Sequence, residues 1–532
     1  MKKIPLFRTS EKIRYFSALM MKNKENKTEM IFFIMILLLH LFPIVVLSPF
    51  VTLDGPTHLY NANLMKSLLT ENNVAVNHFF EFNGFPHPNW TGHFLLTSLL
   101  FVFPPLFTEK IFLMLVIVLS AVGYRKLVKT IEPSSVWLSW LYFPFLLSFP
   151  FLLGFYNFSF ALAILPWWLS FWIRNHRNKF TSKLILQVAL FFLVLYFSHL
   201  VVFLLSGLFA GLISIFSQGN NNRKAVLNDL KILFICSTPG LLFTIIFLAS
   251  AGTGGFRGEV SRLPGMQLLS DILYSRMFIV YDYSTERSIT LGYSVLMVLL
   301  IFTGVFHRTV QRFQKTFFTI LIISLALIFI MPDSMASGGI LSVRLVQWFF
   351  MALILWLVTL RIPKKFQVAG AVLSALFSVG MMRVHWRVQL ELNGNAKEYI
   401  SMAEKIEGNR VLLPLNYSGN WMHSNLSCYL GATKRIVVLD NYEATHDLFP
   451  LLWKKGMDPE IHMGNHVSSN HPCVRILSSE KQTGMKVNYI TMWHSPADNN
   501  DSCDADVKKQ IDANYQLEMK GSNSSLYVRK QE

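Results

Sequence analysis

The sequence predicts an α-helical membrane protein that crosses the bilayer about eleven times and ends in a smaller α/β domain. Of its 532 residues, 52% are hydrophobic and only 15% are charged, which is a larger apolar share than one soluble core of this length needs. The hydrophobic residues form runs of about 16 to 20 between short basic stretches, and a helix of that length crosses a hydrocarbon core of ~30 Å. These two observations exclude a soluble globular enzyme.

The spans follow from the positions of the apolar runs. The segment before the first run is too long and too charged for the n-region of a cleaved signal peptide, so we expect the first helix to stay as a membrane anchor. The predicted helices cover residues 31–50, 109–124, 134–152, 156–173, 184–199, 200–216, 231–250, 291–306, 316–331, 345–360 and 366–382.

Membrane topology explains the net charge of +17. When alternate connections are assigned to the cytoplasm, those segments carry 24 Lys and Arg against 5 Asp and Glu, whereas the rest of the chain carries 24 against 26. The positive-inside rule predicts this asymmetry, so the charge gives no reason to expect a nucleic acid as partner. The cytoplasmic segments are residues 1–30, 125–132, 174–183, 223–231, 308–315 and 361–365.

The composition changes near residue 382. Residues 383–532 hold 17 basic and 17 acidic residues, and their apolar runs have the length of strands, as in a soluble domain. With an odd number of spans, this domain is extracytoplasmic, that is periplasmic or extracellular. We therefore expect a basic cytoplasmic N-terminus (1–30), a cell-membrane domain (31–382) with external loops at 51–108 and 251–290, and a soluble α/β domain (383–532).

The predicted soluble domain combines one helix with several short strands. Residues 396–406 have apolar side chains at helical spacing, and four segments have the pattern of buried strands: 411–415, 436–439, 489–492 and 526–528. Cys428, Cys473 and Cys503 allow one disulfide at most, and the pairing stays open. Since the chain has no CxxC pair, a zinc site is not expected among them.

Asp54 is the first candidate for chemistry, because it follows the first span at the membrane surface. Gly55 and Pro56 after it predict a turn into a helix that lies along the interface and carries His58. An Asp before a helix with Pro in its first turn is a common cap. A carboxylate held where a lipid-borne and a water-borne substrate meet is also a candidate catalytic group. The two roles are compatible.

The arrangement resembles the GT-C superfamily of membrane glycosyltransferases, which includes oligosaccharyltransferases, protein O-mannosyltransferases and lipid A aminoarabinose transferases. Members share a first helix ending in an external acidic residue, a long first loop with juxtamembrane helices, a second hydrophobic segment led by Pro and aromatic residues, and often an external C-terminal domain. Asp54 matches the acidic residue, and FPHPNWTGHFLLTSLLFVFPP at residues 85–105 matches the approach to the second segment. The resemblance covers essentially the whole chain and implies an inverting, polyprenyl-phosphate-dependent transferase of the cell envelope.

Two departures from the family concern metal binding. Many members have a second acidic residue beside the first, whereas Gly55 and Pro56 follow Asp54 here. A second external acidic position of some members is matched by Asn157. No residue is therefore assigned as a metal ligand, and a divalent metal stays an open question among the cofactors.

Further polar residues are predicted at the same external ends. Arg344 is the first choice for holding the donor phosphate, because its planar guanidinium matches a phosphate, and Arg257 and Arg262 are the second choice. Snorkelling toward the interface is the alternative for Arg344. His58, His199 and Asn157 are candidates for orienting the substrate; the competing interpretations are structural hydrogen bonding for the histidines and a loop cap for Asn157.

The predicted function is transfer of a sugar from a polyprenyl-phosphate donor to a glycan, lipid or protein acceptor at the external membrane face, with Asp54 as the catalytic carboxylate. The alternative is a non-catalytic protein or transporter that binds or moves a lipid-linked glycan. Ionisable side chains inside the predicted spans are few, chiefly His40 and His199, which disfavours ion-coupled transport. A receptor would need only one or two anchoring helices.

Overall fold

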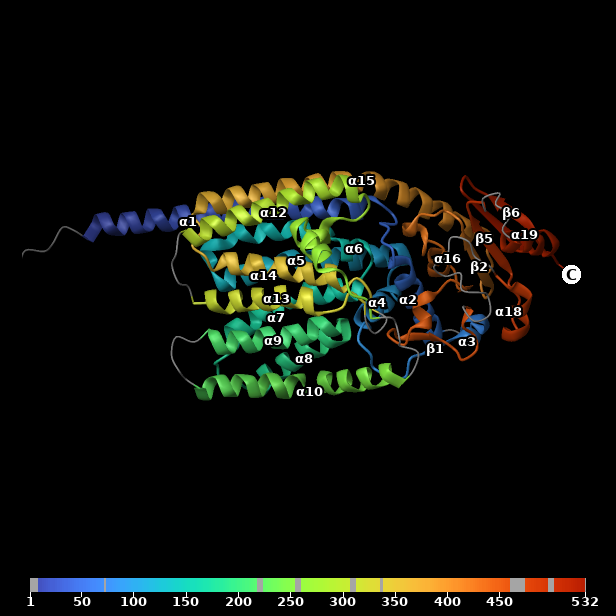
Figure 1. The fold of residues 1–532 in the computed structure, drawn as a ribbon, viewed down its shortest axis with the longest axis horizontal. Helices are drawn as coiled ribbons and strands as arrows, with labels where there is room; N and C mark the ends of the chain where they lie inside the picture. The colour runs from blue at the N-terminus through green and yellow to red at the C-terminus, as the bar shows by residue number, and fades with distance from the viewer. Residues whose placement is uncertain are drawn as a thin grey trace, which may run out of the picture.

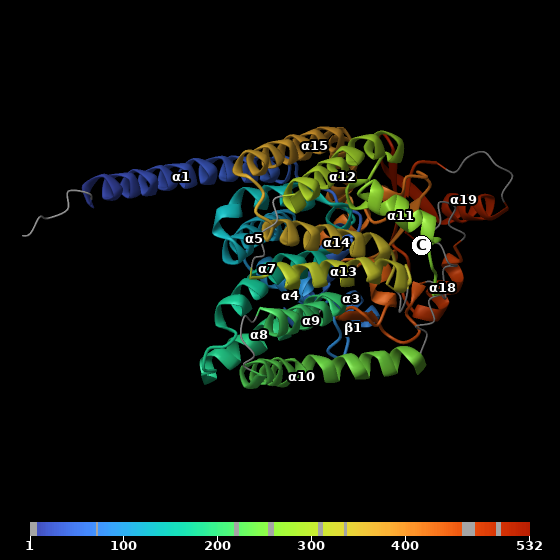
Figure 2. The same cartoon turned by 60° about the vertical axis from the view of Figure 1, so that its left-hand side comes forward.

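The computed structural model describes residues 8–70, 73–217, 223–253, 260–306, 312–334, 338–459, 474–495 and 502–531. It shows a bundle of long, roughly parallel helices with a smaller mixed α/β part at one end (Figure 1). The turned view shows the same arrangement, with α1 (Arg8–Val46) extending beyond the opposite end (Figure 2).

Each predicted span falls on a helical segment of the bundle. Eight described segments are long and apolar enough to cross a membrane, including the part of α1 from Lys27 onward. Three more helices, α8, α9 and α13, have 17 residues each, at the lower limit for a span. The count of eleven therefore stays a prediction. The remaining bundle helices are α5 (Pro105–Ile131), η1 (Pro133–Leu147), α6 (Phe149–Leu152), α7 (Tyr156–Asn175), α8 (Ser182–Ser198), α9 (Leu200–Phe216), α10 (Arg223–Thr253), α12 (Tyr283–Phe306), α13 (Gln314–Ile330), α14 (Leu341–Val358) and α15 (Lys364–Ser401).

Local sequence signals set several helix ends. Pro105 opens α5 at the first helical position, where its missing N–H costs nothing. Thr181 caps α8 by accepting a hydrogen bond from the backbone of Leu184, as expected for a Thr N-cap. Between α8 and α9 a single extended residue, His199 (φ −164°, ψ 123°), interrupts the helix. Because of this interruption, α8 ends and α9 begins at His199.

The predicted helix at residues 134–152 differs from expectation in its geometry. Its first part is the 3₁₀ helix η1, and the short helix α6 follows. Pro144 lies inside η1 and has no N–H to donate to an α-helical ladder. Neighbouring helices bury almost all of the segment. Its length and hydropathy still qualify residues 133–152 as a candidate span.

The first external loop forms four short elements: α2 (Gly55–Thr70), α3 (Val74–Phe79), β1 (Phe80–Phe82) and α4 (Thr91–Leu100). The helix expected after Asp54 is present as α2, but 11 of its 16 residues are buried, so it lacks the exposed polar face of an amphipathic surface helix; its position along the membrane interface stays a prediction. The C-terminal part covers it: the Tyr60 hydroxyl donates to the Ile436 carbonyl (3.1 Å) and accepts from the Val438 N–H (2.8 Å).

The C-terminal part contains the predicted sheet. Its strand order is β3-β2-β5-β7-β6, with β2 parallel to β3 and β5, and β7 antiparallel to β5 and β6. All four predicted strands are present, and β6 was missed because most of its side chains are exposed. A separate antiparallel pair joins β1 of the first loop to β4. The strands are β2 (Val411–Asn416), β3 (Val437–Val438), β4 (Leu451–Trp453), β5 (Tyr489–Trp493), β6 (Tyr515–Lys520) and β7 (Ser524–Arg529).

Short helices complete both external parts. In the second external loop they are α11 (Gly265–Leu273) and η2 (Arg276–Phe278). In the C-terminal part they are η3 (Met402–Lys405), η4 (Trp421–His423), α16 (Cys428–Thr433), η5 (Tyr442–Thr445), α18 (Ile476–Thr483) and α19 (Ser502–Asn514). Cys428 is buried without a disulfide. Cys473 and the side chain of Cys503 lie outside the described residues.

One helix connects the bundle to the C-terminal part. α15 runs for 38 residues without a break past residue 382, the predicted end of the membrane domain, to Ser401. The helix predicted at residues 396–406 is the last part of α15 together with η3. The sheet is therefore carried on a continuous helical extension of the bundle.

The two ends of the bundle differ in charge. The starts of α10, α13 and α15, where basic segments were predicted to be cytoplasmic, lie at the end away from the sheet (Figure 1). The first external loop and the sheet share the other end. The positive-inside rule predicts that the end away from the sheet faces the cytoplasm.

We predict that reporter fusions at residues 30 and 364 are cytoplasmic and that a fusion at residue 480 is outside. A phosphatase that folds only outside the cytoplasm and a fluorescent protein that folds only inside it give complementary readouts. A cytoplasmic signal at residue 480 would place the α2 loop and the sheet on the wrong side for an external site.

Candidate active site

A cavity of about 540 Å³ lies where the bundle meets the C-terminal part. Its lining combines charged and polar side chains with a wall of apolar ones, and it includes five of the seven residues singled out from the sequence. Those five are Asp54, His58, Asn157, His199 and Arg344. They come from the first loop, from α7, from the α8–α9 junction and from α14, so the cavity exists only in the folded bundle.

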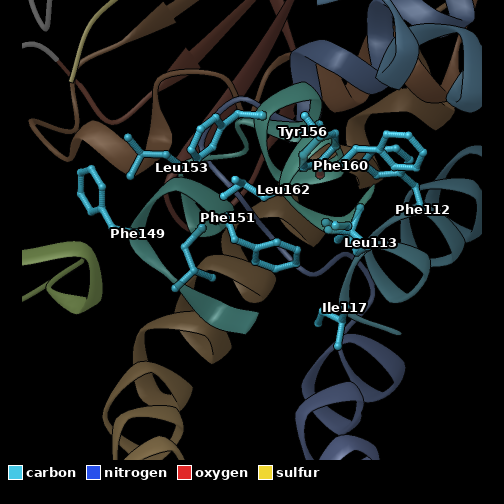
Figure 3. Close-up of a cluster of buried hydrophobic side chains, with 14 of the residues drawn as sticks. Phe112, Leu113, Ile117, Phe149, Phe151, Leu153, Tyr156, Phe160 and Leu162 are labelled. Carbon is cyan, nitrogen blue, oxygen red and sulfur yellow. The ribbon is translucent and has the colours of Figure 1, made fainter. Parts of the chain in front are cut away.

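A backbone contact with the end of α6 fixes the position of Asp54. The backbone N–H groups of Leu53 and Asp54 donate to the carbonyls of Leu152 (3.2 Å) and Leu153 (3.0 Å). Gly154 is required beside them, because its φ of +80° favours glycine and an added Cβ would lie 2.7 Å from the Asp54 nitrogen. Leu153 also belongs to a cluster of buried apolar side chains that includes Tyr156 and Phe160 (Figure 3).

The carboxylate of Asp54 is held by the C-terminal part. The Asn425 amide donates to Asp54 Oδ1 (3.2 Å) and to the Leu53 carbonyl (3.0 Å), and the Tyr442 hydroxyl donates a further hydrogen bond to the Asp54 carboxylate. At the start of α2, the Asp54 backbone carbonyl accepts from the His58 N–H (3.0 Å). The Asp54 side chain therefore faces the cavity and binds Asn425 and Tyr442, while its backbone carbonyl makes the contact with α2.

Burial changes the acidity of Asp54. It raises the pKa of the carboxyl group to about 6, while the nearby charges of His58 and Arg344 and the Tyr442 hydrogen bond lower it and Glu443 raises it. An ordinary Asp titrates near 3.9. Asp54 is therefore still largely ionised at neutral pH and is a stronger base than an exposed aspartate, as a proton acceptor in catalysis should be.

The guanidinium of Arg344 is held in place at the cavity by several contacts. Nη2 donates to the Gly339 carbonyl (2.9 Å), Nη1 donates to His199 Nε2 (3.2 Å), and the guanidinium lies over the Phe155 ring at 4.1 Å. Its Nε has no partner among the described residues. The side chain is half-buried and lines the cavity, and Nη1 and Nη2 each carry a second N–H that can donate to an anion.

Asn157 has a structural task in addition to lining the cavity. Its Oδ1 accepts from the Gly92 N–H at 2.7 Å, which fixes the first turn of α4 against the first turn of α7. A Cβ at Gly92 would come within 3.0 Å of that oxygen. Asn157 was expected to cap its own loop; instead its side chain accepts a hydrogen bond from the N-terminal end of α4.

Of the two remaining arginines, the structure describes only Arg262 and does not bring it to the cavity. Arg262 is exposed and donates to the Ile330 carbonyl (3.0 Å), and it is not among the cavity-lining residues. Arg257 lies outside the described residues. Of the three proposed phosphate ligands, Arg344 alone faces the cavity in the part of the chain that the structure describes.

Sequence reasoning missed the residues contributed by the C-terminal part. Tyr442, His446 and Phe449 line the cavity, and Glu443 lies directly behind it. They belong to a polar and aromatic run that begins right after the parallel strand β3. Polar residues at the carboxyl end of a parallel strand often form ligand sites, and that position was the available signal.

A buried carboxylate below the site was also missed. Glu109, near the N-terminal end of α5, accepts hydrogen bonds from the Tyr156 hydroxyl (2.8 Å) and the Tyr429 hydroxyl (3.1 Å). It thereby joins α5, α7 and α16. Tyr156 also lines the cavity, so Glu109 acts as part of the frame that supports the site.

Glu443 forms a buried cluster with two histidines. Its Oε1 lies 2.8 Å from His58 Nδ1 and its Oε2 lies 3.0 Å from His93 Nε2. Burial would raise the pKa of Glu443, but the charges and hydrogen bonds of His58 and His93 lower it to about 2. Burial likewise opposes charging of His58, whose pKa Glu443 and Asp54 nevertheless raise. The cluster therefore carries a permanent carboxylate between two imidazoles.

The two carboxylates differ in their fitness for a metal. Asp54 is approached by the hydrogen-bond donors Asn425 and Tyr442 and shares its cavity with Arg344, so a cation does not fit there. His58, His93 and Glu443 each offer one ligand atom, and these atoms lie within 4.8 Å of one another. This group has the donor types and the burial of a metal site.

Comparison with known proteins gives a structural likeness and no sequence relative. No protein-family model and no curated protein matches this chain. The crystal structure of ArnT from Cupriavidus metallidurans bound to undecaprenyl phosphate aligns with 94% of this chain and 97% of that chain, with a TM-score of 0.44 and 9% sequence identity. At this level of likeness, the function has to be argued from the site itself.

The contact at Gly154 leads to a prediction. In Gly154→Ala the left-handed backbone costs about 1 kcal/mol and the new Cβ also collides with the Asp54 nitrogen. Gly484→Ala is the matched control, because Gly484 has φ +70° with no atom within 4 Å of the added Cβ. Thermal unfolding of the purified protein should show a larger loss of Tm for Gly154→Ala. Equal losses would mean that the Asp54 backbone is not held by this contact.

Proposed function

We propose that this protein transfers a sugar from a polyprenyl-phosphate carrier to an acceptor hydroxyl at the external face of the membrane. The observation that carries the proposal is that one cavity joins the Asp54 carboxylate, the fixed Arg344 guanidinium and an apolar wall. These are the three environments that a lipid-linked phosphosugar and its acceptor need.

The apolar wall suits the prenyl chain. It is formed by Leu200, Val201 and Leu204 of α9 and by Phe247 and Leu248 of α10. Leu204 and Leu248 are 43% and 50% exposed on the outside of the bundle as well, where a membrane protein meets lipid. A carrier in the bilayer therefore reaches the cavity along α9 and α10 without passing through water.

Arg344 suits the phosphate of the donor. A guanidinium presents several N–H groups in one plane and binds phosphate oxygens through charge-assisted hydrogen bonds. The bonds to Gly339 and His199 and the stacking on Phe155 hold this plane in place before the substrate arrives. Such preorganisation stabilises the charge that develops on a leaving phosphate.

Asp54 suits the acceptor. Its carboxylate takes the proton of the acceptor hydroxyl as the hydroxyl oxygen forms a bond to the anomeric carbon. The bond between that carbon and the phosphate oxygen breaks, and its electron pair stays on the phosphate, beside Arg344. A single displacement of this kind inverts the anomeric centre, and the proton on Asp54 is released to water afterwards.

The direct test is transfer by the purified protein from a panel of radiolabelled polyprenyl-phosphate sugars to membrane glycan, lipid and protein fractions. Label should move only when the carrier is present. Tight binding of the carrier with no transfer to any acceptor would favour the non-catalytic alternative, a protein that binds or moves a lipid-linked glycan.

Asp54→Asn separates catalysis from structure. Asn keeps the size of the side chain and caps helices as well as Asp does, but it cannot accept the proton. We expect near-normal expression and thermal stability with turnover lowered ~100-fold or more. If transfer survives in Asp54→Asn and Asp54→Ala instead lowers stability by ~1 kcal/mol, the residue is a structural cap and not the base.

The arginines give a second, paired prediction. Arg344→Lys keeps the charge but loses the planar fork, and we expect donor affinity to fall about 10-fold or more, with a larger loss for Arg344→Gln. Arg262→Gln is the control, because the structure places Arg262 against Ile330 and away from the cavity. Saturation kinetics with the lipid donor measures both. A loss in Arg262→Gln equal to that in Arg344→Gln would move the phosphate site to the second external loop.

A further inference from the structure

We propose that His58, His93 and Glu443 bind a divalent transition metal ion of the zinc type beside the cavity, at a site distinct from Asp54. The proposal stands on the geometry of these three side chains and does not depend on the transfer reaction. All three are buried, with exposed fractions of 5%, 0% and 0%.

The ligand atoms converge as they do around a tetrahedral ion. His58 Nδ1 and His93 Nε2 lie 3.3 Å apart, and the two carboxylate oxygens of Glu443 lie 2.8 Å and 3.0 Å from these nitrogens. Zinc bonds of about 2.0–2.2 Å place neighbouring ligand atoms roughly 3.3 Å apart in a tetrahedron. The nitrogen atoms already have this separation, and small movements of the Glu443 side chain would give it to the oxygens.

Outer hydrogen bonds orient two of the three ligands. His58 Nε2 donates to the Gly154 carbonyl (2.9 Å), which leaves the lone pair of a neutral ring on Nδ1, directed at the cluster. Asn61 donates to Glu443 Oε2 (2.8 Å) and is itself held by the Asn441 amide (2.6 Å). Metal-binding histidines commonly donate their second ring N–H to a carbonyl in this way, and ligating carboxylates commonly accept outer hydrogen bonds.

The lone pairs require a positive charge between them. With a neutral His58, its Nδ1 lone pair faces both a carboxylate oxygen and the ring of His93, and this is repulsive at a buried position. A cation removes the repulsion, and so does an additional proton on the imidazole. Two imidazole nitrogens with one carboxylate suit zinc and related transition metals, whereas Mg²⁺ and Ca²⁺ prefer oxygen ligands.

The ion would join three parts of the chain that are far apart in sequence. His58 is on α2, His93 is on α4 and Glu443 is on η5, and the neighbour of Glu443, Tyr442, donates to the carboxylate of Asp54. The bound metal would thus be a positioning device that holds the C-terminal part on the first loop and keeps the Tyr442 hydroxyl in place.

The test measures metal content and thermal stability of the full-length protein, with no activity assay. Protein dialysed against chelator and then against Zn²⁺ should retain about one Zn²⁺ per chain and gain Tm, and Co²⁺ in its place should give visible ligand-field absorption. His93→Ala and Glu443→Gln should lose the bound metal. His78→Ala is the control, because His78 is in the same loop but binds the Thr483 carbonyl.

Three results would overturn the proposal. The first is wild-type protein that binds neither Zn²⁺ nor Co²⁺ and does not change its Tm, which means that protons hold the cluster together. The second is equal Zn²⁺ in wild type, His93→Ala and Glu443→Gln. The third is stabilisation by Mg²⁺ but not by Zn²⁺. Since the wild-type measurements need no variant, a variant that does not fold leaves the proposal testable.

Discussion

The arrangement of the candidate site depends on a short backbone contact between the first loop and the end of α6. Two hydrogen bonds join Leu53 and Asp54 to Leu152 and Leu153, and Gly154 permits the close approach through its positive φ. A loop carboxylate would otherwise sample many positions at the membrane surface, at an entropic cost on every substrate encounter. Here the hydrogen bonds to the bundle fix the backbone position of Asp54.

The C-terminal part supplies the remaining side chains of the candidate site. Asn425, Tyr442 and Glu443 approach from a segment nearly 400 residues later in the chain and supply partners for Asp54 and His58. The β1–β4 pair and the Tyr60 hydrogen bonds hold that part against the first loop. The site is therefore an interface between the bundle and the C-terminal part, with polar groups from both and an apolar wall from α9 and α10.

Much of this arrangement could be predicted from the sequence, because the membrane restricts where polar groups lie. The predicted spans fall on helices and the predicted strands form the sheet, since apolar runs and turns signal both directly. Asp54, His199 and Arg344 were found because polar residues at the external ends of spans stand out from their surroundings. Their convergence on one cavity follows from the helix packing.

What could not be predicted depends on long-range contacts. Nothing in the local sequence says that Asn425 and Tyr442 reach Asp54, or that the C-terminal part buries most of α2. Arg262 has the same local features as a phosphate ligand, but its side chain turns to the Ile330 carbonyl. The His58–His93–Glu443 cluster was invisible for the same reason, because its three members are on separate elements.

The central claim is that one cavity holds the carrier phosphate at Arg344 with the prenyl chain along α9 and α10, within reach of Asp54. An experimental structure of the protein with a polyprenyl phosphate bound tests it most directly. The account predicts phosphate oxygens about 3 Å from the Arg344 guanidinium and the chain against Leu204 and Leu248. A phosphate bound away from Arg344, or a chain that enters elsewhere in the bundle, would contradict it.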